Sequence, residues 1–251
     1  MNNLLQAHDP KELIDLGKSL FELMREGHLL LYFNNPDLQS ILTQLDLDGA
    51  VRPGDGDFVM VVDSNIGFSK VNQYIDHSLE YSVNLTDTAN PQGEILLHYE
   101  HTQPGTDGCF QGAGGEFPDY YLSRCYWNFW RVLTGKGTNL KGETHTPVPQ
   151  EYFREGTQWH NEVEVGISEA ETVVFSGLTV VPQLQEESIR LETLLPSAVL
   201  HQDEEGKLIY SLRIQKQPGI NNLPVEIRVT APSGFMVEDL SNGWVLSSDN
   251  S

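Results

Sequence analysis

Apolar residues in the first 45 positions recur at the spacing of α-helices. Four leucines follow one another at intervals of three and four residues: Leu13, Leu16, Leu20 and Leu23. Ile14, Phe21 and Met24 lie beside them, so one helix face is apolar. Asp9 and Pro10 suit the N-cap and the first helical position. A second, shorter helix is predicted over Pro36–Leu45.

From about residue 50 the pattern changes to the alternation that is typical of strands. Val163, Val165 and Ile167, for example, alternate with polar or small residues. Turn-forming residues separate the segments. The predicted strands are Phe58–Val62, Tyr74–Leu85, Glu94–His101, Arg124–Leu133, Glu162–Ile167, Glu171–Val180, Glu187–Leu194, Leu208–Gln215 and Val225–Thr230.

The order of these elements predicts the fold class. Few helix-length segments separate the strands, which favours a β-sandwich over βαβ units. The expected fold is α+β, mainly β, with N-terminal helices packed on or beside an antiparallel β-sheet and then a β-sandwich-like C-terminal part. The stretch 134–158 is loop-like. It suggests a mixed α/β part over residues 1–155 and an all-β part over residues 156–251, unless the two form one continuous domain.

Charge narrows the range of partners. The 251 residues include 15 Lys and Arg against 36 Asp and Glu, a formal net charge of −21. Affinity for nucleic acids comes mostly from basic side chains that neutralise phosphates, so no nucleic-acid partner is expected. The same acidity argues against direct contact with an anionic membrane surface. No apolar run approaches the ~20 residues that span a bilayer.

The two cysteines of the chain provide an indication of the redox state of its cellular compartment. The interval between Cys109 and Cys125 contains several glycines and a proline, which indicates a surface loop. A disulfide closing such a loop would stabilise the fold by roughly 3 kcal/mol and would indicate an oxidising compartment. The alternative is a pair of unrelated buried thiols.

Oxygen-bearing side chains flank the first predicted strand. Asp55 and Asp57 precede it, and Asp63 and Asn65 follow it. Such groups are typical Ca²⁺ ligands, so Asp55 and Asp57 are weak candidates for a metal site and no other cofactor is expected. A strand of about five residues separates its ends by roughly 17 Å, so the two pairs cannot share one ion. Turn formation is the alternative role.

An aromatic segment, Tyr120–Trp130, has two faces if it is a strand. Cys125, Trp127 and Phe129 lie on one face, which we interpret as core. Tyr126 and Trp130 lie on the other, beside polar residues. Aromatic rings on such a face can bind a sugar or anchor a protein partner. Alternatively a second layer, such as the N-terminal helix, covers them.

Several segments resemble a bacterial family catalogued as domain of unknown function 4012. They are Leu29–Gln39, Val61–Asn72, Tyr81–Leu85, Arg124–Val132, Thr172–Pro182 and Ile214–Gly219. The resemblance covers the C-terminal half of the family only. It implies a fragment of an extracytoplasmic envelope protein, tethered through a membrane helix that this fragment lacks. The family has no established activity, cofactor or catalytic residue.

The most recognisable stretch of that resemblance contains Asp63, Asn65 and Lys70. Lys70 is expected to pair with Asp63 across a turn, with Asn65 bonding backbone groups, which makes a structural corner; a Lys–Asp acid/base pair is the alternative. The leading hypothesis is a non-catalytic binding or scaffolding module whose partner is an envelope glycan or a protein. The alternatives are an enzyme acting on cell-envelope polymers and a purely structural spacer.

Overall fold

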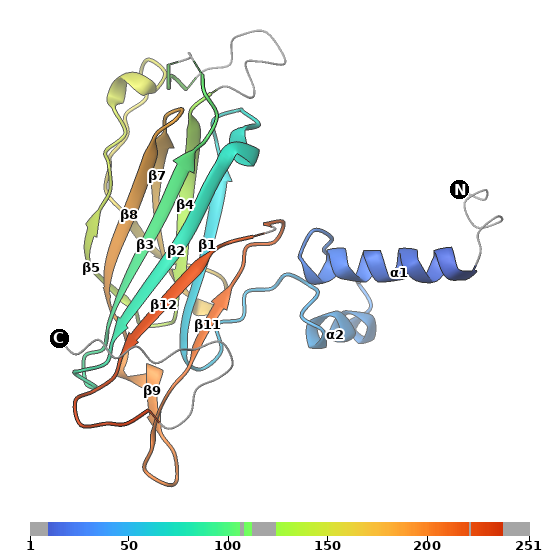
Figure 1. Cartoon of the computed structure of the whole chain (residues 1–251), viewed down its shortest axis with the longest axis vertical. Helices are drawn as coiled ribbons and strands as arrows, with labels where there is room; N and C mark the ends of the chain where they lie inside the picture. The colour runs from blue at the N-terminus through green and yellow to red at the C-terminus, as the bar shows by residue number, and fades with distance from the viewer. Residues whose placement is uncertain (1–9, 106–107, 112–123, 221, 238–251) are drawn as a thin grey trace.

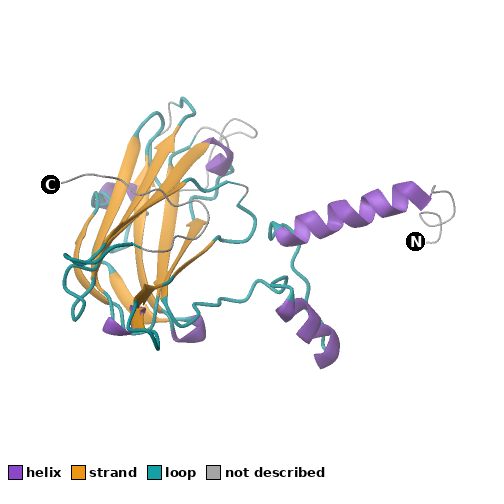
Figure 2. Cartoon of the chain, turned by 60° about the horizontal axis from the view of Figure 1, so that its bottom comes forward, coloured by secondary structure: helices purple, strands orange, loops and turns teal. Residues whose placement is uncertain are grey.

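The computed structural model describes residues 10–105, 108–111, 124–220 and 222–237. Two five-stranded β-sheets lie face to face, and two helices project from one side of them (Figure 1). The secondary-structure view separates the strand-rich body from this helical segment (Figure 2). The predicted class, α+β and mainly β, is therefore confirmed.

The first sheet has the order β11-β1-β4-β7-β6, and we call it the β1 sheet. Its strands are Leu212–Gln215 (β11), Asp57–Asn65 (β1), Tyr126–Thr134 (β4), Val173–Val181 (β7) and Glu164–Ile167 (β6). The second, the β2 sheet, has the order β12-β2-β3-β8-β5. Its strands are Val225–Thr230 (β12), Ile75–Asn84 (β2), Gln92–His101 (β3), Glu186–Leu194 (β8) and Asn139–Thr144 (β5).

The pairing within these sheets is mixed. β11 runs parallel to β1 and β12 runs parallel to β2, whereas the other pairs in the two sheets are antiparallel. A small antiparallel pair joins β9 (Leu200–Gln202) to β10 (Leu208–Tyr210). In the described part of the chain, short 3-10 helices lie in the connections: Val71–Tyr74 (η1), Gln150–Tyr152 (η2), Glu169–Glu171 (η3) and Ser197–Val199 (η4). The parallel edges differ from the antiparallel sheet that we expected.

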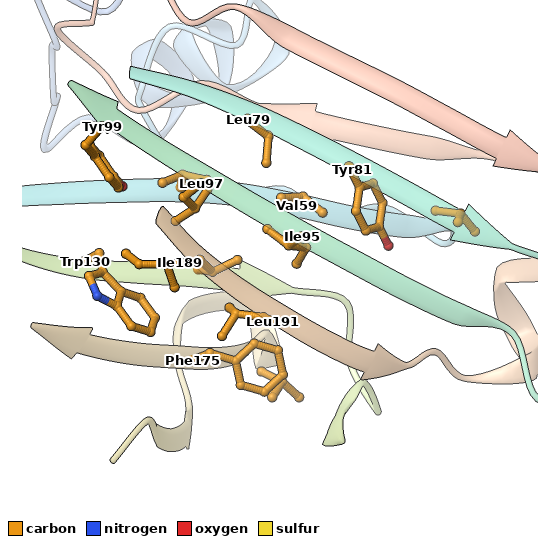
Figure 3. Packing of buried hydrophobic residues seen from close by; sticks show 14 of the residues in the cluster. Val59, Leu79, Tyr81, Ile95, Leu97, Tyr99, Trp130, Phe175, Ile189 and Leu191 are labelled. Atoms are coloured by element: carbon orange, nitrogen blue, oxygen red, sulfur yellow. The ribbon is translucent and has the colours of Figure 1, made fainter. Parts of the chain in front are cut away.

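The main core lies between the two sheets. Figure 3 shows side chains of β2, β3 and β8 pointing toward those of β1, β4 and β7. The largest of them are fully buried: Trp130, Tyr81, Tyr99, Phe175, Leu79, Ile95, Leu97, Ile189 and Leu191. Burial of apolar area on this scale is the main force that holds the sheets together.

The local sequence explains which strands have one buried face and which have two. In β8 Ile189, Leu191 and Thr193 point inward, while the alternate residues face outward. This is the pattern of a strand with one solvated face. In β1 Phe58 and Met60 are also buried, on the outer face with Leu133. Both faces of β1 are therefore covered, which is why Phe58–Val62 reads as one continuous apolar run.

The division expected near residue 155 does not separate two sheets. β4 pairs with β7 along nine residues, and β3 pairs with β8 over a similar length, although these partners lie on opposite sides of residue 155. Both halves of the chain contribute to the core between the sheets. The sandwich is one continuous unit rather than a C-terminal part.

All nine predicted strands correspond to observed strands, but three features were missed. No strand was predicted at β9 (Leu200–Gln202). β5 lies in the stretch 134–158 that we expected to be a loop. The predicted strand Leu208–Gln215 is two strands, β10 and β11, which are separated at Ser211. β10 pairs with β9, whereas β11 joins the edge of the β1 sheet.

Both predicted helices are confirmed, as α1 (Pro10–Arg25) and α2 (Pro36–Gln44). Asp9, the expected N-cap of α1, lies outside the described residues. Asn35 caps α2 through its side-chain oxygen, which accepts from the backbone of Asp37 and Leu38. Within the described chain neither helix is long and apolar enough to cross a membrane.

The helices do not cover either sheet. They project from the sandwich in both views (Figures 1 and 2). Their attachment lies near β11, where Asp46 pairs with Arg52 at 2.7 Å and with Arg213 at 2.9 Å. Gly27 approaches Pro218 closely, with a positive φ of 77° that favours glycine. The two helices therefore form an arm that is fixed at its base.

The predicted disulfide between Cys109 and Cys125 is confirmed. It lies on the outer face of the β1 sheet, in a small cluster with Trp127 and Phe153. The Trp127 indole donates to the Cys109 carbonyl at 3.0 Å, and the Phe153 ring meets the indole edge-on. The disulfide therefore joins the segment at Cys109 to the residue that precedes β4.

Candidate functional site

β1 places two aspartates in the core between the sheets, one near each end. Asp57 and Asp63 are six residues apart, so their side chains point to the same face of the strand. The Asp57 carboxylate accepts hydrogen bonds from the hydroxyls of Tyr81 and Tyr210, each at 2.6 Å. Burial raises the pKa of Asp57, and the tyrosine hydrogen bonds oppose that shift in part. Asp57 is a structural core residue.

Asp55 and Asp57, the candidate metal ligands, lie in different surroundings. Asp57 is buried against the two tyrosines, whereas Asp55 is exposed in the preceding turn. Ca²⁺ needs six to eight oxygen ligands, which this separated pair does not bring together. In the described part of the chain no group of three or more His, Cys, Asp or Glu residues could hold a metal ion.

Asp63 joins both sheets at the other end of β1. Its Oδ1 accepts hydrogen bonds from the Tyr99 hydroxyl and from the Asn128 side chain, each at 2.7 Å. Its Oδ2 lies 3.4 Å from Nδ1 of His77. Gln217 adds two hydrogen bonds to the Asp63 backbone. The expected Asp63–Lys70 ion pair is therefore wrong, because His77 is the basic partner of this carboxylate.

Burial and the charge of Asp63 shift the pKa values of the neighbouring side chains. The hydrogen bond with Asp63 raises the pKa of His77, and burial opposes this shift. Burial also raises the pKa of Tyr99 and of Tyr126, and the Asp63 charge adds to both effects. The tyrosines therefore stay neutral and serve as donors or packing groups. With only 8% of its side chain exposed, Asp63 cannot meet a large substrate.

We predict that His77 makes the stability of the protein depend on pH. Its pKa is raised in the folded state above the unfolded value of 6.5. Its contribution is therefore fully present below pH ~6.5 and is lost as the pH rises through the higher folded-state pKa. Urea denaturation from pH 6 to 9 should show a falling midpoint for the wild type. His77→Gln should be less stable at pH 6 and should show a flatter profile; equal slopes would contradict the assignment.

Asn65 fixes the loop that follows β1. Its side-chain oxygen accepts from the Gly67 backbone at 2.9 Å. Its side-chain nitrogen donates to the Ser69 carbonyl at 3.2 Å and to the Asn72 side chain at 2.7 Å. The predicted role of Asn65 as a corner residue is confirmed. We call residues 65–70 the corner loop.

The corner loop presents apolar side chains to solvent. Phe68 is 63% exposed and Ile66 is 36% exposed. Phe68 also has a positive φ of 55°, which is rare and strained for a bulky residue. Asn65, Ile66, Phe68, Ser69 and Lys70 line a shallow hollow of about 330 Å³. Sequence reasoning missed Ile66 and Phe68, because a loop sequence does not show which side chains its turn leaves outside.

Lys70 lies on the rim of this hollow. It is exposed, and within the described residues it forms no ion pair. Asp63 has His77 as its basic partner, so Lys70 and Asp63 do not make an acid/base pair. The hollow therefore combines an apolar surface with one available cation.

Tyr126 and Trp130 do not form a binding face. Both belong to the core between the sheets, and Trp130 is fully buried. The alternative that a second layer covers them is confirmed, but that layer is the β2 sheet and not the N-terminal helix. Trp127 and Cys125 lie on the opposite face, in the cluster that also contains Cys109 and Phe153. Both faces of β4 are therefore structural.

A scan of the chain against protein-family models finds no match, and a search of curated proteins finds none either.

Proposed function

We propose that this chain is a non-catalytic, extracytoplasmic module of a membrane-anchored bacterial envelope protein, and that it binds a protein partner through the corner loop. The observation that carries the proposal is the strained exposure of Phe68 beside Lys70. Strained backbone persists only where the surroundings hold it, and it is concentrated at binding and active sites. Here the hydrogen bonds of Asn65 hold it.

The chemistry of the hollow favours a protein segment over a glycan. Sugar recognition depends on many side-chain hydrogen bonds, but both ends of the Asn65 amide are already engaged within the loop. Ile66 and Phe68 can instead pack against an apolar side chain, and Lys70 can pair with a carboxylate next to it. The expected ligand is a peptide segment with a bulky apolar residue beside an acidic one.

Two further observations support the proposed setting. A loop-closing disulfide such as Cys109–Cys125 is typical of oxidising compartments. The resemblance of Val61–Asn72 to the envelope family covers the corner loop itself. The proposal includes neither a nucleic-acid partner nor direct contact with a membrane surface. The net charge of −21 agrees with both exclusions.

An enzyme acting on envelope polymers is the less favoured candidate. Its carboxylates would be Asp57 and Asp63, which face tyrosines in the core rather than the hollow. Asp55 and Lys70 are exposed, but the length of β1 separates them. A general acid and base must both reach the reacting group within hydrogen-bond distance. This arrangement supports binding better than turnover.

The proposal is tested with an array of peptides that combine one bulky apolar residue with one or two carboxylates. We expect the full chain to bind a subset of them. Phe68→Ser and Lys70→Glu should each weaken that binding by at least about tenfold, or ~1.4 kcal/mol. Fluorescence anisotropy of labelled peptides measures the affinity, and thermal denaturation verifies the fold.

Two exposed residues elsewhere provide matched controls. Tyr32, which is 77% exposed, and Lys141, on β5, lie outside the corner loop. Tyr32→Ser and Lys141→Glu should leave peptide binding unchanged. Retained binding in Phe68→Ser would contradict the proposed site. Binding of acidic glycan fragments in place of peptides would favour the glycan alternative, and no binding at all would favour a spacer.

A further inference from the structure

One guanidinium group connects the corner loop to the segment that the disulfide holds. Arg124 is buried, and its Nη1 donates to the Gly67 carbonyl at 3.3 Å. Its Nη2 donates to the carbonyl of Phe110, the residue after Cys109. The backbone of Arg124 is fixed separately, because its carbonyl accepts a hydrogen bond from Nε2 of the buried His101 at 2.8 Å. The side chain therefore joins two carbonyls that lie far apart in the sequence.

The Gly67 carbonyl belongs to the peptide unit whose orientation sets φ of Phe68. That angle is the rotation between this planar unit and the rest of Phe68. Its value of 55° is strained for a bulky residue, so the surroundings have to hold it. Asn65 restrains the peptide unit before Gly67 by accepting from its N–H at 2.9 Å, and Arg124 restrains the unit after it. Without Arg124 the second unit is free to rotate and to relieve the strain.

Trp127 gives the same two segments a second common support. Its backbone carbonyl accepts from the Ile66 N–H at 2.9 Å, and its indole donates to the Cys109 carbonyl at 3.0 Å. A β-carbon at Gly67 would lie 3.1 Å from Cβ of Trp127, so the corner loop lies directly against this side chain. The corner loop and the segment at Cys109 are therefore held at one place, near the start of β4.

The disulfide restrains the segment that carries the Phe110 carbonyl. Cys109 and Cys125 are 16 residues apart, and in the chain-entropy model a cross-link over this length favours the closed arrangement by roughly a hundredfold. Without it, residues 108–111 are held by hydrogen bonds, each of modest net strength. A buried guanidinium that loses an acceptor is unfavourable. Loss of the cross-link is therefore expected to let Arg124 reorient and release the corner loop.

We propose that the Cys109–Cys125 disulfide, acting through Arg124, holds the corner loop in its exposed conformation, so that tight binding of a partner requires the oxidised chain. This inference rests on the proposed function of the corner loop and names the regulation of that site. Arg124 is buried, whereas the hollow is lined by residues of the corner loop. Arg124 is therefore a positioning residue rather than a ligand-binding one.

The oxidation takes place as the chain folds. The two cysteines release two thiol protons and two electrons as the S–S bond forms, and a disulfide-bonded oxidant accepts them and becomes a dithiol. In the folded chain Cys109 is 7% exposed and Cys125 is 1% exposed, which shields the bond from reductants. The corner loop therefore reflects the redox state of the compartment in which the chain folded. A chain that folds under reducing conditions would not engage its partner.

Amide hydrogen exchange of the full chain, followed by NMR, tests the positioning without a ligand. The Ile66 and Gly67 amides are both hydrogen-bonded in the structure. We expect them to exchange at least about tenfold faster in Cys109→Ser/Cys125→Ser, because the loop opens more often. Arg124→Lys retains the disulfide and the charge but lacks the planar fork that joins two carbonyls, so it should have the same effect.

Two controls separate this local effect from a general loss of stability. Arg228→Lys, at an exposed position on β12, should leave both exchange rates unchanged. The amides of Ala89 and Asn90 bond to Asp87 at the opposite end of β2, and their exchange should be the same in every variant. Unchanged exchange of the corner loop in both test variants would overturn the proposal.

Peptide binding then tests the regulation. With a peptide selected by the array, Cys109→Ser/Cys125→Ser and Arg124→Lys should each bind at least about tenfold more weakly than the oxidised wild type. Wild type refolded with excess dithiol should match the double-serine variant, on which the dithiol itself should have no effect. Full affinity in a variant with faster exchange would overturn the regulation. If the oxidised wild type binds no peptide, the proposed function fails, and the exchange rates still decide the role of Arg124.

Discussion

Replacing Asp63 with alanine is expected to lower the free energy of unfolding by about 3–5 kcal/mol, the cost of removing one partner of a buried charged pair. The Tyr99 hydroxyl and the Asn128 amide would both lose their acceptor, and His77 would lose its anion. Because domains of this kind have only about 5–15 kcal/mol in total, the variant will be marginally stable. Urea denaturation followed by circular dichroism measures the change.

Lys70→Ala is the matched control for this prediction. Lys70 is exposed and forms no ion pair in the described part of the chain, so its loss should change stability by less than about 0.5 kcal/mol. Asp63→Asn, which retains an acceptor oxygen without the charge, should lie between the two. Similar losses of stability for Asp63→Ala and Lys70→Ala would indicate a direct ion pair between the two residues and would contradict the structure.

Truncating Trp130 to alanine is expected to destabilise the sandwich by about 3–5 kcal/mol, as for other fully buried aromatic residues. Trp130 lies between the sheets and directly opposite Gly177 of β7. A β-carbon at position 177 would lie 2.4 Å from Cζ2 of the indole. The missing side chain of Gly177 therefore provides the space that the indole occupies.

A double-mutant cycle tests this pairing. Gly177→Ala alone should cost about 1–3 kcal/mol through overpacking. In the background of Trp130→Leu, which vacates the space, the same change should cost much less. Residues in contact couple by about 0.5–3 kcal/mol in such cycles. Additive effects would show that the indole and Gly177 do not share this space and would contradict the packing between them.

The difference between the predicted and the observed role of Trp130 has a physical cause. Alternation along β4 divides its side chains into two faces and correctly places Trp127 and Trp130 on opposite ones. It does not show whether another layer covers a face. That depends on β2, β3 and β8, which lie far away in the sequence and reach β4 only through the packing of the sheets.

The corner loop also shows that contacts between residues close in the sequence can be predicted, whereas contacts with distant strands cannot. Asn65 could be predicted as a corner residue because its hydrogen bonds are local, within seven residues. Lys70 was expected to pair with Asp63 because both lie at one turn. The partners that Asp63 has instead come from β2, β3 and β4, which no local argument could place beside it.

The features that could be predicted from the sequence are local: the two helices, the approximate position of nine strands and the disulfide loop. Each follows from periodicity, capping or turn residues within a few positions of one another. The remaining features depend on how the strands pair and pack. β5 is an edge strand with few inward side chains, so pairing with β8 defines it. The alternation at Leu208–Gln215 is unbroken, but the segment forms two strands on either side of Ser211. The first strand pairs with β9 and the second pairs with β1. Sheet order, parallel edges and the buried role of Trp130 all depend on contacts between residues far apart in the chain.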